Sequence, residues 1–329
     1  MNEIKKILVI GGAGYVGTNL VMELLKNKYH VTVYDLMIYG NKLPEGKSNL
    51  KTIRGDVRDQ RKLEQSLKGQ DAIIHLACIS NDPSFELNPK LGQEINFDCF
   101  EPLIKASKNN GVKQFIYASS SSVYGVKDIP DVTEDASLEP LTDYSKFKAK
   151  CEDILISNTN NNFIGTIIRP ATVCGFSLRQ RLDLVVNILT NLAYHKNLIK
   201  IFGGSQLRPN IHIDDMVRSY ICVLNAKKNI VQDQIFNVGF ENHSVEKLAL
   251  MVKKNIKSEV NLEYAKSDDN RSYHINSNKI KKVLGFKPIK SIEEAIQDLI
   301  SAFEKKLFSN TLSNEEYFNI KKMQKIDLK

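Results

Sequence analysis

The sequence lacks any apolar run long enough to cross a bilayer. Its longest apolar runs are as short as residues 7–10, whereas a membrane-spanning helix needs about 20 apolar residues. The first residues of the chain also lack the apolar stretch and the small-residue cleavage site of a signal peptide. These absences predict a cytoplasmic protein that does not enter a membrane.

Cysteine is scarce, and its spacing does not match a metal site. The cysteines are far apart, odd in number and without a CxxC pair; they are Cys78, Cys99, Cys151, Cys174 and Cys222. The six histidines are equally scattered. Neither a zinc site nor a disulfide framework is expected, and reduced thiols fit best.

The chain also lacks a block of consecutive basic residues interleaved with aromatic residues. Lys and Arg number 46 against 38 Asp and Glu, which gives a net charge of +8. Nucleic-acid binding is therefore not expected, whereas an anionic small molecule such as a nucleotide diphosphate suits this balance. Hydrophobic residues make up 42% of the chain and charged residues 26%, a composition that excludes disorder as the main state.

Short apolar runs alternate with helical patterns through the first half of the chain. Strands rich in Ile and Val are predicted at residues 6–11, 30–35, 51–55, 72–77, 114–120 and 163–169. Helices are predicted between them, at residues 15–27, 61–67, 92–109 and 143–158. Because such alternation gives right-handed βαβ units, it predicts an α/β fold with a doubly wound, Rossmann-type parallel sheet.

A glycine-rich loop follows the first strand and opens the first helix, with glycine at positions 11, 12, 14 and 17. Glycines allow a tight turn and a close approach of the backbone to a pyrophosphate, which a helix N-terminus attracts. Asp35 ends the next strand, where its carboxylate would accept hydrogen bonds from the adenine-ribose hydroxyls and repel a 2′-phosphate. Leu36 brings no compensating cation. The unit predicts NAD, rather than NADP, as the cofactor.

Two further strand ends fit that cofactor. Asp56 and Val57 follow the third strand, where an aspartate can reach the adenine edge; a turn or N-cap role for Asp56 is the alternative. Leu76 and Ala77 end the fourth strand, where small residues would let a cofactor lie close. Core packing is the alternative for this pair.

The second half of the chain is less regular. We expect residues 1–169 to form the NAD-binding domain and residues 170–329 a smaller, interleaved C-terminal substrate lobe. Strand-like segments at residues 210–213 and 234–238 would return to the sheet. An amphipathic helix is predicted over residues 291–306, and the tail beyond Asn310 shows no clear role.

A serine run ends the fifth strand at residues 119–122, and a YxxxK pair, Tyr144 and Lys148, follows downstream. On a helix, residues four apart share a face, so Lys148 would hold its ammonium near the Tyr144 phenol and a cofactor ribose. A nearby cation favours the phenolate and lowers a tyrosine pKa. A serine hydroxyl beside the pair would orient the substrate oxygen, giving a proton-transfer device beside a hydride carrier.

In this order the motifs resemble the extended short-chain dehydrogenase/reductase superfamily, in particular its NAD-dependent nucleotide-sugar epimerases and dehydratases. The resemblance runs to about residue 290 and is carried by residues 11–17, Asp35, 56–57, 119–125, Tyr144, Lys148, 169–170 and 208–215. It implies that the catalytic residues are Ser120, Tyr144 and Lys148, with Tyr144 as the acid/base. No metal is expected.

The motifs and the resemblance together give two sets of binding residues. Those expected to contact the cofactor are Gly11, Gly14, Tyr15, Val16, Gly17, Asp35, Leu36, Asp56, Val57, Leu76, Ala77, Asn96, Tyr144 and Lys148. Those expected to contact the substrate are Ser80, Asn81, Ser120, Ser121, Thr172, Arg179, Arg181, Arg208 and Arg271. Among these, Asn96 matches a cofactor-contacting residue of relatives, and Arg208 would bind the nucleotide diphosphate through a bidentate fork.

Three other polar residues are interpreted as structural. Asp214 is expected to cap the helix that follows it. His212 lacks an accompanying nucleophile motif. Cys174 stands near a position where relatives carry a substrate contact; a role as acid/base for ring-carbon epimerisation is the alternative to a small buried residue.

The expected activity is hydride transfer at C4 of a nucleoside-diphosphate sugar, with 4-epimerisation favoured. The alternatives are a 4-dehydrogenase or 4-keto-sugar reductase on an NDP-hexose or NDP-heptose, and a non-catalytic NAD-binding regulator. No 4,6-dehydration is expected, because Ser121 and Ser122 stand where family dehydratases carry Asp-Glu. Relatives pair through two long helices, so a homodimer through residues 92–109 and the helix of Tyr144 is expected.

Overall fold

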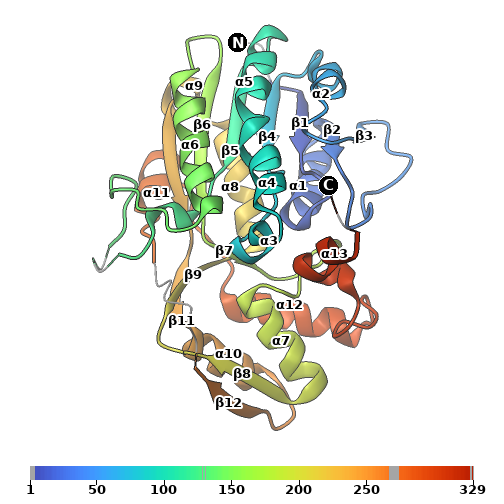
Figure 1. The fold of residues 1–329 in the computed structure, drawn as a ribbon, viewed down its shortest axis with the longest axis vertical. Coiled ribbons are helices and arrows are strands. Elements are labelled where there is room, and N and C mark those ends of the chain that lie inside the picture. The colour runs from blue at the N-terminus through green and yellow to red at the C-terminus, as the bar shows by residue number, and fades with distance from the viewer. Residues whose placement is uncertain (1–3, 128, 130, 267–273, 327, 329) are drawn as a thin grey trace.

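A seven-stranded parallel sheet forms the centre of the molecule (Figure 1). The computed structural model describes residues 4–127, 129, 131–266, 274–326 and 328, and within them the strand order is β10-β6-β5-β4-β1-β2-β3. The strands are β1 (Lys6–Ile10), β2 (His30–Asp35), β3 (Leu50–Arg54), β4 (Ala72–His75), β5 (Gln114–Ala118), β6 (Ile164–Pro170) and β10 (Gln234–Val238). This order confirms the doubly wound, Rossmann-type sheet predicted from the sequence.

Helices cover both faces of this sheet. One face carries α1 (Tyr15–Lys26) and α8 (Ile213–Asn225); the other carries α2 (Gln60–Leu67), α5 (Phe100–Asn109) and α6 (Asp143–Ser157). Along β1, Ile7 and Val9 pack into the apolar cluster of the first face, whereas Leu8 and Ile10 pack into that of the second. Because both faces are buried, β1 is apolar at every position after the exposed Lys6.

The helix predicted over residues 92–109 is interrupted. It consists of α4 (Pro89–Gln93), a π-helical turn (Glu94–Asp98) and α5, and α3 (Asp82–Glu86) precedes it. The prediction of one long helix is therefore wrong in detail. The π-helical turn shifts the helical register at Asn96 and buries that side chain.

The second lobe contains two small sheets, visible below the main sheet in Figure 1. One consists of β11 (Glu241–Ser244), β9 (Leu207–His212) and β7 (Thr172–Cys174), and the other of β12 (Asn261–Ala265) and β8 (Leu198–Phe202). The helices α7 (Val185–Lys196), α10 (Val245–Asn255) and α12 (Ile292–Glu304) pack around them. The other helices of the described residues are α9 (Lys228–Val231), α11 (Asn278–Leu284) and α13 (Asn319–Ile326).

Only one of the two segments expected to return to the main sheet does so. Residues 234–238 join it as β10, beside β6. Residues 210–213 do not, because β9 forms its backbone hydrogen bonds with β7 and with antiparallel β11. The next helix, α8, is capped by His212 and not by Asp214: Nδ1 of His212 accepts the Asp214 N–H at 3.1 Å.

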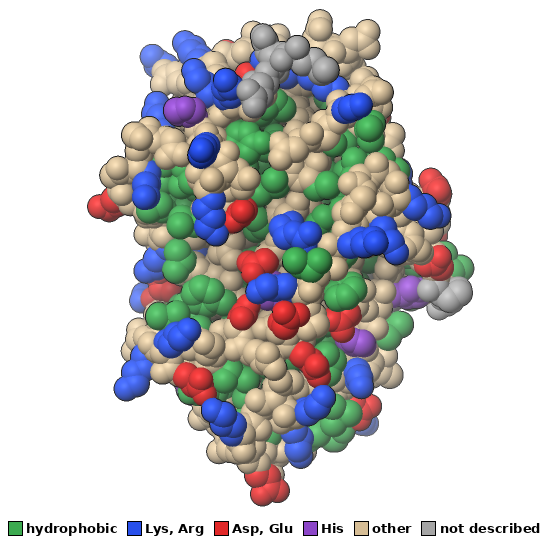
Figure 2. All heavy atoms as spheres, turned by 180° about the vertical axis from the view of Figure 1, so that it is seen from behind, with side chains coloured by type: hydrophobic (Ala, Val, Ile, Leu, Met, Phe, Trp, Pro, Cys, Tyr) green, Lys and Arg blue, Asp and Glu red, His purple; other side chains and the backbone are tan. Residues whose placement is uncertain are grey.

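No helix of the described residues is long and apolar enough to cross a membrane. Acidic and basic side chains lie interleaved across the middle of the face shown in Figure 2. On this part of the surface the basic side chains are therefore mixed with acidic ones.

Candidate active site

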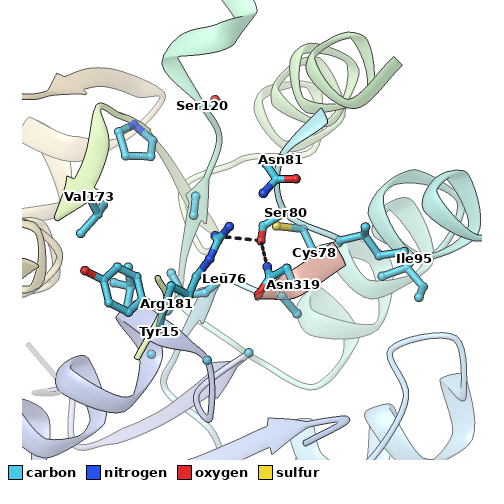
Figure 3. A pocket seen from close by; sticks show the side chains of 18 of the residues that line it. Tyr15, Leu76, Cys78, Ser80, Asn81, Ile95, Ser120, Val173, Arg181 and Asn319 are labelled. Atoms are coloured by element: carbon cyan, nitrogen blue, oxygen red, sulfur yellow. Dashed lines mark hydrogen bonds between the residues drawn. The ribbon is translucent and has the colours of Figure 1, made fainter. Parts of the chain in front are cut away.

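A pocket opens at the carboxyl ends of the central strands, where β1 and β4 are neighbours but their connections leave in opposite directions. Parallel sheets bind ligands at this switch point. The pocket is lined by the ends of β1 to β5, by the first turn of α1, and by loops of the second lobe. Figure 3 shows Arg181 reaching across it from the second lobe toward Ser80.

The glycine loop is built so that its backbone approaches the pocket. Gly11 has a φ of +85°, and a Cβ on it would lie 2.5 Å from the backbone nitrogen of Ala77. A Cβ on Gly17 would collide with the carbonyl oxygen of Gly11. A Cβ on Gly14 would meet only that oxygen within 4 Å and would otherwise occupy pocket space. The loop is thus a cradle that side chains would fill.

The N-terminus of α1 faces the same pocket through Tyr15, Val16 and Gly17. No described side chain caps this terminus, and its first turn contains no acidic residue. Free N–H groups and the positive end of the helix dipole are therefore available to an anion.

Asp35, at the end of β2, lines one end of the pocket. Its carboxylate accepts hydrogen bonds from the N–H of Met37 at 2.7 Å and of Ala13 at 2.9 Å. Burial raises the pKa of Asp35, and these hydrogen bonds and the charge of Arg179 offset part of that effect. Arg179 stacks on Tyr39, with its guanidinium carbon 3.7 Å from the ring centroid. The second lobe thus brings a cation to the Asp35 end.

The other end of the pocket contains Ser120, Tyr144 and Lys148. Tyr144 lies in the first turn of α6, which Thr142 and Ser145 stabilise through a capping box. Lys148 is 3% exposed, and its Nζ donates to the carbonyl oxygen of Ala118 at 2.6 Å and lies 5.9 Å from the Tyr144 ring centroid. Oγ of Ser120 lies 2.8 Å from Oγ of Ser122. The three residues that the sequence analysis predicts to act in proton transfer therefore lie at one end of the same pocket.

Behind this group lies a buried ion pair that fixes the ends of β5 and β6. The guanidinium of Arg169 donates to Glu152 on α6 at 2.6 Å and to the hydroxyl of Tyr124 at 2.7 Å. Ser119 also donates to Glu152. Since the arginine and the glutamate are each 2% exposed, this network is part of the rigid support of α6.

The loop of residues 175–181 fastens the second lobe onto α1. The hydroxyl of Tyr15 donates to the carbonyl oxygen of Gly175 at 2.7 Å, and Ser177 Oγ donates to the carbonyl oxygen of Tyr15 at 2.8 Å. Arg181 then projects into the pocket, with Nε bonded to Asp183 at 2.8 Å and Nη1 to Ser80 at 3.2 Å. Its Nη2 is buried and has no partner among the described residues, which leaves a cationic donor for an anion.

Most of the expected binding residues line this one pocket. All the expected cofactor residues except Asn96 do so, as do Ser80, Asn81, Ser120, Ser121, Thr172, Arg179 and Arg181 of the substrate set. Arg271 lies outside the described residues. Asp56 lines the pocket with its carboxylate held by Arg58: burial acts to raise its pKa, but the hydrogen bonds and charge of Arg58 outweigh it and lower the pKa.

Two expected residues do not line the pocket. The side-chain amide of Asn96 forms two hydrogen bonds with the backbone of Ile79. It accepts one from the Ile79 N–H at 2.8 Å and donates one to the Ile79 carbonyl oxygen at 3.0 Å. Asn96 therefore braces the loop after β4. Arg208 lies on β9, away from the main sheet, and donates to the carbonyl oxygen of Leu207 at 2.9 Å.

The pocket also contains residues that the sequence analysis missed, among them Tyr39, Asp82 and Asn319. Asp82 is 8% exposed and accepts a hydrogen bond from Thr142, the N-cap of α6. Asp82 directly follows Ser80 and Asn81, which were expected at the substrate, so its place in that polar loop was a signal. No local motif distinguishes Tyr39 or Asn319, because each reaches the pocket only through the tertiary fold. Cys174, by contrast, is fully buried outside the pocket lining, and burial raises the pKa of its thiol.

Comparisons with known proteins agree with this geometry. The model of the NAD dependent epimerase/dehydratase family matches residues 7–239. The UDP-glucose 4-epimerase of Lactobacillus helveticus is 27% identical over an alignment of 319 residues, which covers 90% of this chain and 95% of that protein.

Two solved structures extend the comparison to the whole fold. The UDP-glucose 4-epimerase of Thermotoga maritima with UDP-glucose superposes with a TM-score of 0.83 at 26% identity, covering 92% of this chain and 100% of that one. The UDP-glucuronic acid 4-epimerase of Bacillus cereus, in complex with UDP-glucuronic acid and NAD, gives a TM-score of 0.81 at 28% identity, covering 91% and 99%.

Proposed function

The chain belongs to the NAD-dependent epimerase/dehydratase family, and we propose that it is a nucleotide-sugar 4-epimerase with NAD as its resident cofactor and UDP-sugars as its substrates. The observation that carries the proposal is a single pocket that unites the glycine cradle, Asp35 and the group of Ser120, Tyr144 and Lys148. Relatives and solved structures that are UDP-sugar 4-epimerases support the choice of reaction and of nucleotide.

The residues present fit NAD. The cradle around Gly14 leaves room for a pyrophosphate beside the uncapped N-terminus of α1. Asp35 offers carboxylate oxygens to a ribose and disfavours a 2′-phosphate. We assign cofactor binding mainly to residues 1–169 and substrate binding mainly to the interleaved lobe of residues 170–329. Arg179 belongs to that lobe but lies at the Asp35 end of the pocket.

NAD, when bound, would supply the acceptor for the C4 hydride and the donor for its return. The residues of the chain move the proton: Tyr144 takes it from the C4 hydroxyl, while Ser120 orients the same oxygen. The buried ammonium of Lys148 stabilises the negative charge that Tyr144 carries before it takes the proton. When the 4-keto sugar presents its other face, Tyr144 gives the proton back and the product is the C4 epimer.

Arg181 would hold the diphosphate of the substrate. Its partnerless Nη2 lies in a pocket wall next to Ser80, and one carboxylate, Asp183, pairs with its Nε. A charge-assisted hydrogen bond from a buried guanidinium to a phosphate oxygen would satisfy that donor. The sugar then lies between Arg181 and Tyr144, with its C4 hydroxyl at the catalytic end.

Net 4,6-dehydration is disfavoured. It requires a second acid/base to remove the C5 proton, and Ser121 is buried without a base beside it in the serine run. The structure does add one carboxylate to the pocket, that of Asp82, but this group is bonded to Thr142 at the start of α6. We therefore propose that the product keeps the mass of the substrate.

A homodimer would form through α5 and α6. On these neighbouring helices and the turn before α5, Phe97 and Phe147 stack with ring centroids 5.0 Å apart, and both are only partly buried in the single chain. Ala106 of α5 and Ile154 of α6 are also apolar and only partly buried. Sedimentation should show a dimer at micromolar concentration, and a Phe147→Glu variant should shift it to a monomer; a wild-type monomer contradicts the assignment.

The test of the function is product analysis. The purified protein with NAD+ is incubated with UDP-glucose, UDP-galactose, UDP-glucuronic acid and UDP-arabinose, and the nucleotide sugars are separated by chromatography. We expect at least one to equilibrate with its C4 epimer. If none is converted, the proposed substrate class is wrong.

A further inference from the structure

The C-terminal segment, defined here as residues 311–326, packs against the candidate active site. It contains a 3-10 turn (Glu315–Tyr317) and α13, and Figure 1 shows α13 beside α3 at the carboxyl end of the sheet. Met323 is 6% exposed and belongs to the same apolar cluster as Ile79 and Phe85. The segment is thus attached to the first domain, although it follows the last helix of the second lobe.

Asn319, the first residue of α13, bonds to both walls of the pocket and is 3% exposed. Its Nδ2 donates to Oγ of Ser80 at 2.9 Å, on the wall made by the loop after β4. Its Oδ1 accepts from Nη2 of Arg179 at 2.8 Å, and its backbone N–H donates to Asp183 at 2.8 Å, both on the second-lobe wall. Figure 3 shows Asn319 next to Ser80 and Arg181. One amide therefore bridges the two walls.

The Arg179 side chain that Asn319 holds covers the Asp35 end of the pocket. It is 4% exposed and stacks on Tyr39. Burial lowers the pKa of Arg179 to about 10, with the neighbouring charge of Arg181 adding to the effect, so it is a cation at neutral pH. Its Nε is buried without a partner among the described residues. An anionic group of a ligand in the pocket would satisfy this donor.

We propose that the C-terminal segment is a wall of the cofactor site, and that Asn319 is a positioning residue which holds Arg179 over bound NAD and slows its release. The inference rests on the proposed function, since it takes NAD as the cofactor. It also deepens that function. An epimerase regenerates its cofactor within each turnover and needs no exchange, whereas a dehydrogenase must release the cofactor every time.

The test is the rate at which NADH leaves the protein, followed by its fluorescence when excess NAD+ is added. Asn319→Leu keeps the side-chain size and removes both amide hydrogen bonds. We expect NADH release to be faster by about tenfold, because a hydrogen bond to a charged group is lost. Asn319→Asp keeps an acceptor for Arg179 and should release NADH at close to the wild-type rate. Gln324→Ala, an exposed position on the same helix, is the matched control.

Equal release rates in wild type and Asn319→Leu would overturn the proposal, as would equally fast release from the Leu and Asp variants. Should Asn319→Leu fail to fold, hydrogen–deuterium exchange of the wild-type protein decides: added NAD+ should protect the amides of α13, and unchanged exchange would overturn the proposal. The assay contains no nucleotide sugar, so a wrong substrate assignment leaves it unaffected. If the wild-type protein binds neither NADH nor NAD+, the proposed function is wrong as well.

Discussion

The two walls of the pocket are built in different ways. The first wall comes from residues 11–148, and its side chains lie on the carboxyl ends of parallel strands and on the loops and helices that follow them. The second comes from residues 170–184, from Met216 and Tyr220 of α8, and from Asn319 and Leu328 near the C-terminus. It depends on hydrogen bonds between buried polar groups of distant segments. Tyr15 to Gly175 and Asn319 to Ser80 are such bonds.

The first wall contains the residues proposed to transfer the proton, whereas the second contains residues proposed to bind the ligands. Helix geometry places Tyr144 and Lys148, four residues apart on α6, on the same side of that helix, and the capping box at its start fixes its first turn. The second wall has freedom to vary in sequence and length without disturbing the sheet. We therefore expect changes in the first wall to affect turnover and changes in the second to affect affinity.

The largest effect is expected at Tyr144. Replacing it with Phe removes the group that takes the C4 proton and leaves the pocket shape unchanged, so kcat should fall on the order of 10²-fold or more. NADH binding, measured by fluorescence titration, should stay within about twofold of wild type. Turnover of a nucleotide sugar at the wild-type rate would show that the first wall does not contain the acid/base.

A smaller effect, on affinity, is expected at Arg181. Arg181→Met keeps the aliphatic stem and removes the cation, so KM for the nucleotide sugar should rise about 10- to 100-fold with a lesser change in kcat. Arg208→Met is the comparison, because the sequence motif favours that arginine whereas the structure places it outside the pocket lining. We expect its KM to change by less than about threefold. If Arg208→Met raises KM more than Arg181→Met does, the sequence motif is right and Arg208 is the arginine that binds the phosphates.

A third effect, on cofactor choice, is expected at Asp35, where the two walls meet. Asp35→Ala removes the charge that opposes a 2′-phosphate and leaves Arg179 close by. The preference for NAD over NADP should fall by about tenfold, measured as the ratio of the two Kd values. If Asp35→Ala binds NADP no better than wild type does, the discrimination lies elsewhere.

The smallest effect is expected for Asn96→Ala. Because its amide bonds only to the backbone of Ile79 in the described structure, the loss should appear as a lower free energy of unfolding, by about 1–3 kcal/mol. Denaturant unfolding measures this, and Kd for NADH at 10 °C is the second readout. If the Asn96→Ala variant unfolds with the wild-type free energy but its Kd for NADH is tenfold higher, Asn96 contacts the cofactor after all.

These contrasts also explain what the sequence could predict. The boundaries of β2 match the prediction, and those of α1 and α6 differ from it by one residue, because strand–helix periodicity is local and strong in this half of the chain. The glycine loop, Asp35 and the YxxxK pair were found because each is a short motif on such an element.

The second wall has no equivalent signal. Arg208 fits a motif, yet β9 pairs with β7 and β11, and this tertiary choice takes it away from the pocket. Asn319 lies in a Lys- and Asn-rich tail whose composition predicts nothing. Asp82 follows Ser80 and Asn81 in the polar loop after β4, but its hydrogen bond with Thr142 depends on the packing of α3 beside α6.

Epimerisation in D2O tests the central claim, that a hydride leaves C4 and returns to it within one closed pocket. The enzyme with NAD+ is allowed to equilibrate a UDP-sugar with its C4 epimer, and both are analysed by mass spectrometry and proton NMR. We expect an unchanged mass once the hydroxyl protons are exchanged back, and a full proton signal at C4 in both sugars. Deuterium bound to carbon, or a product lighter by about 18 or 2 Da, would contradict the account.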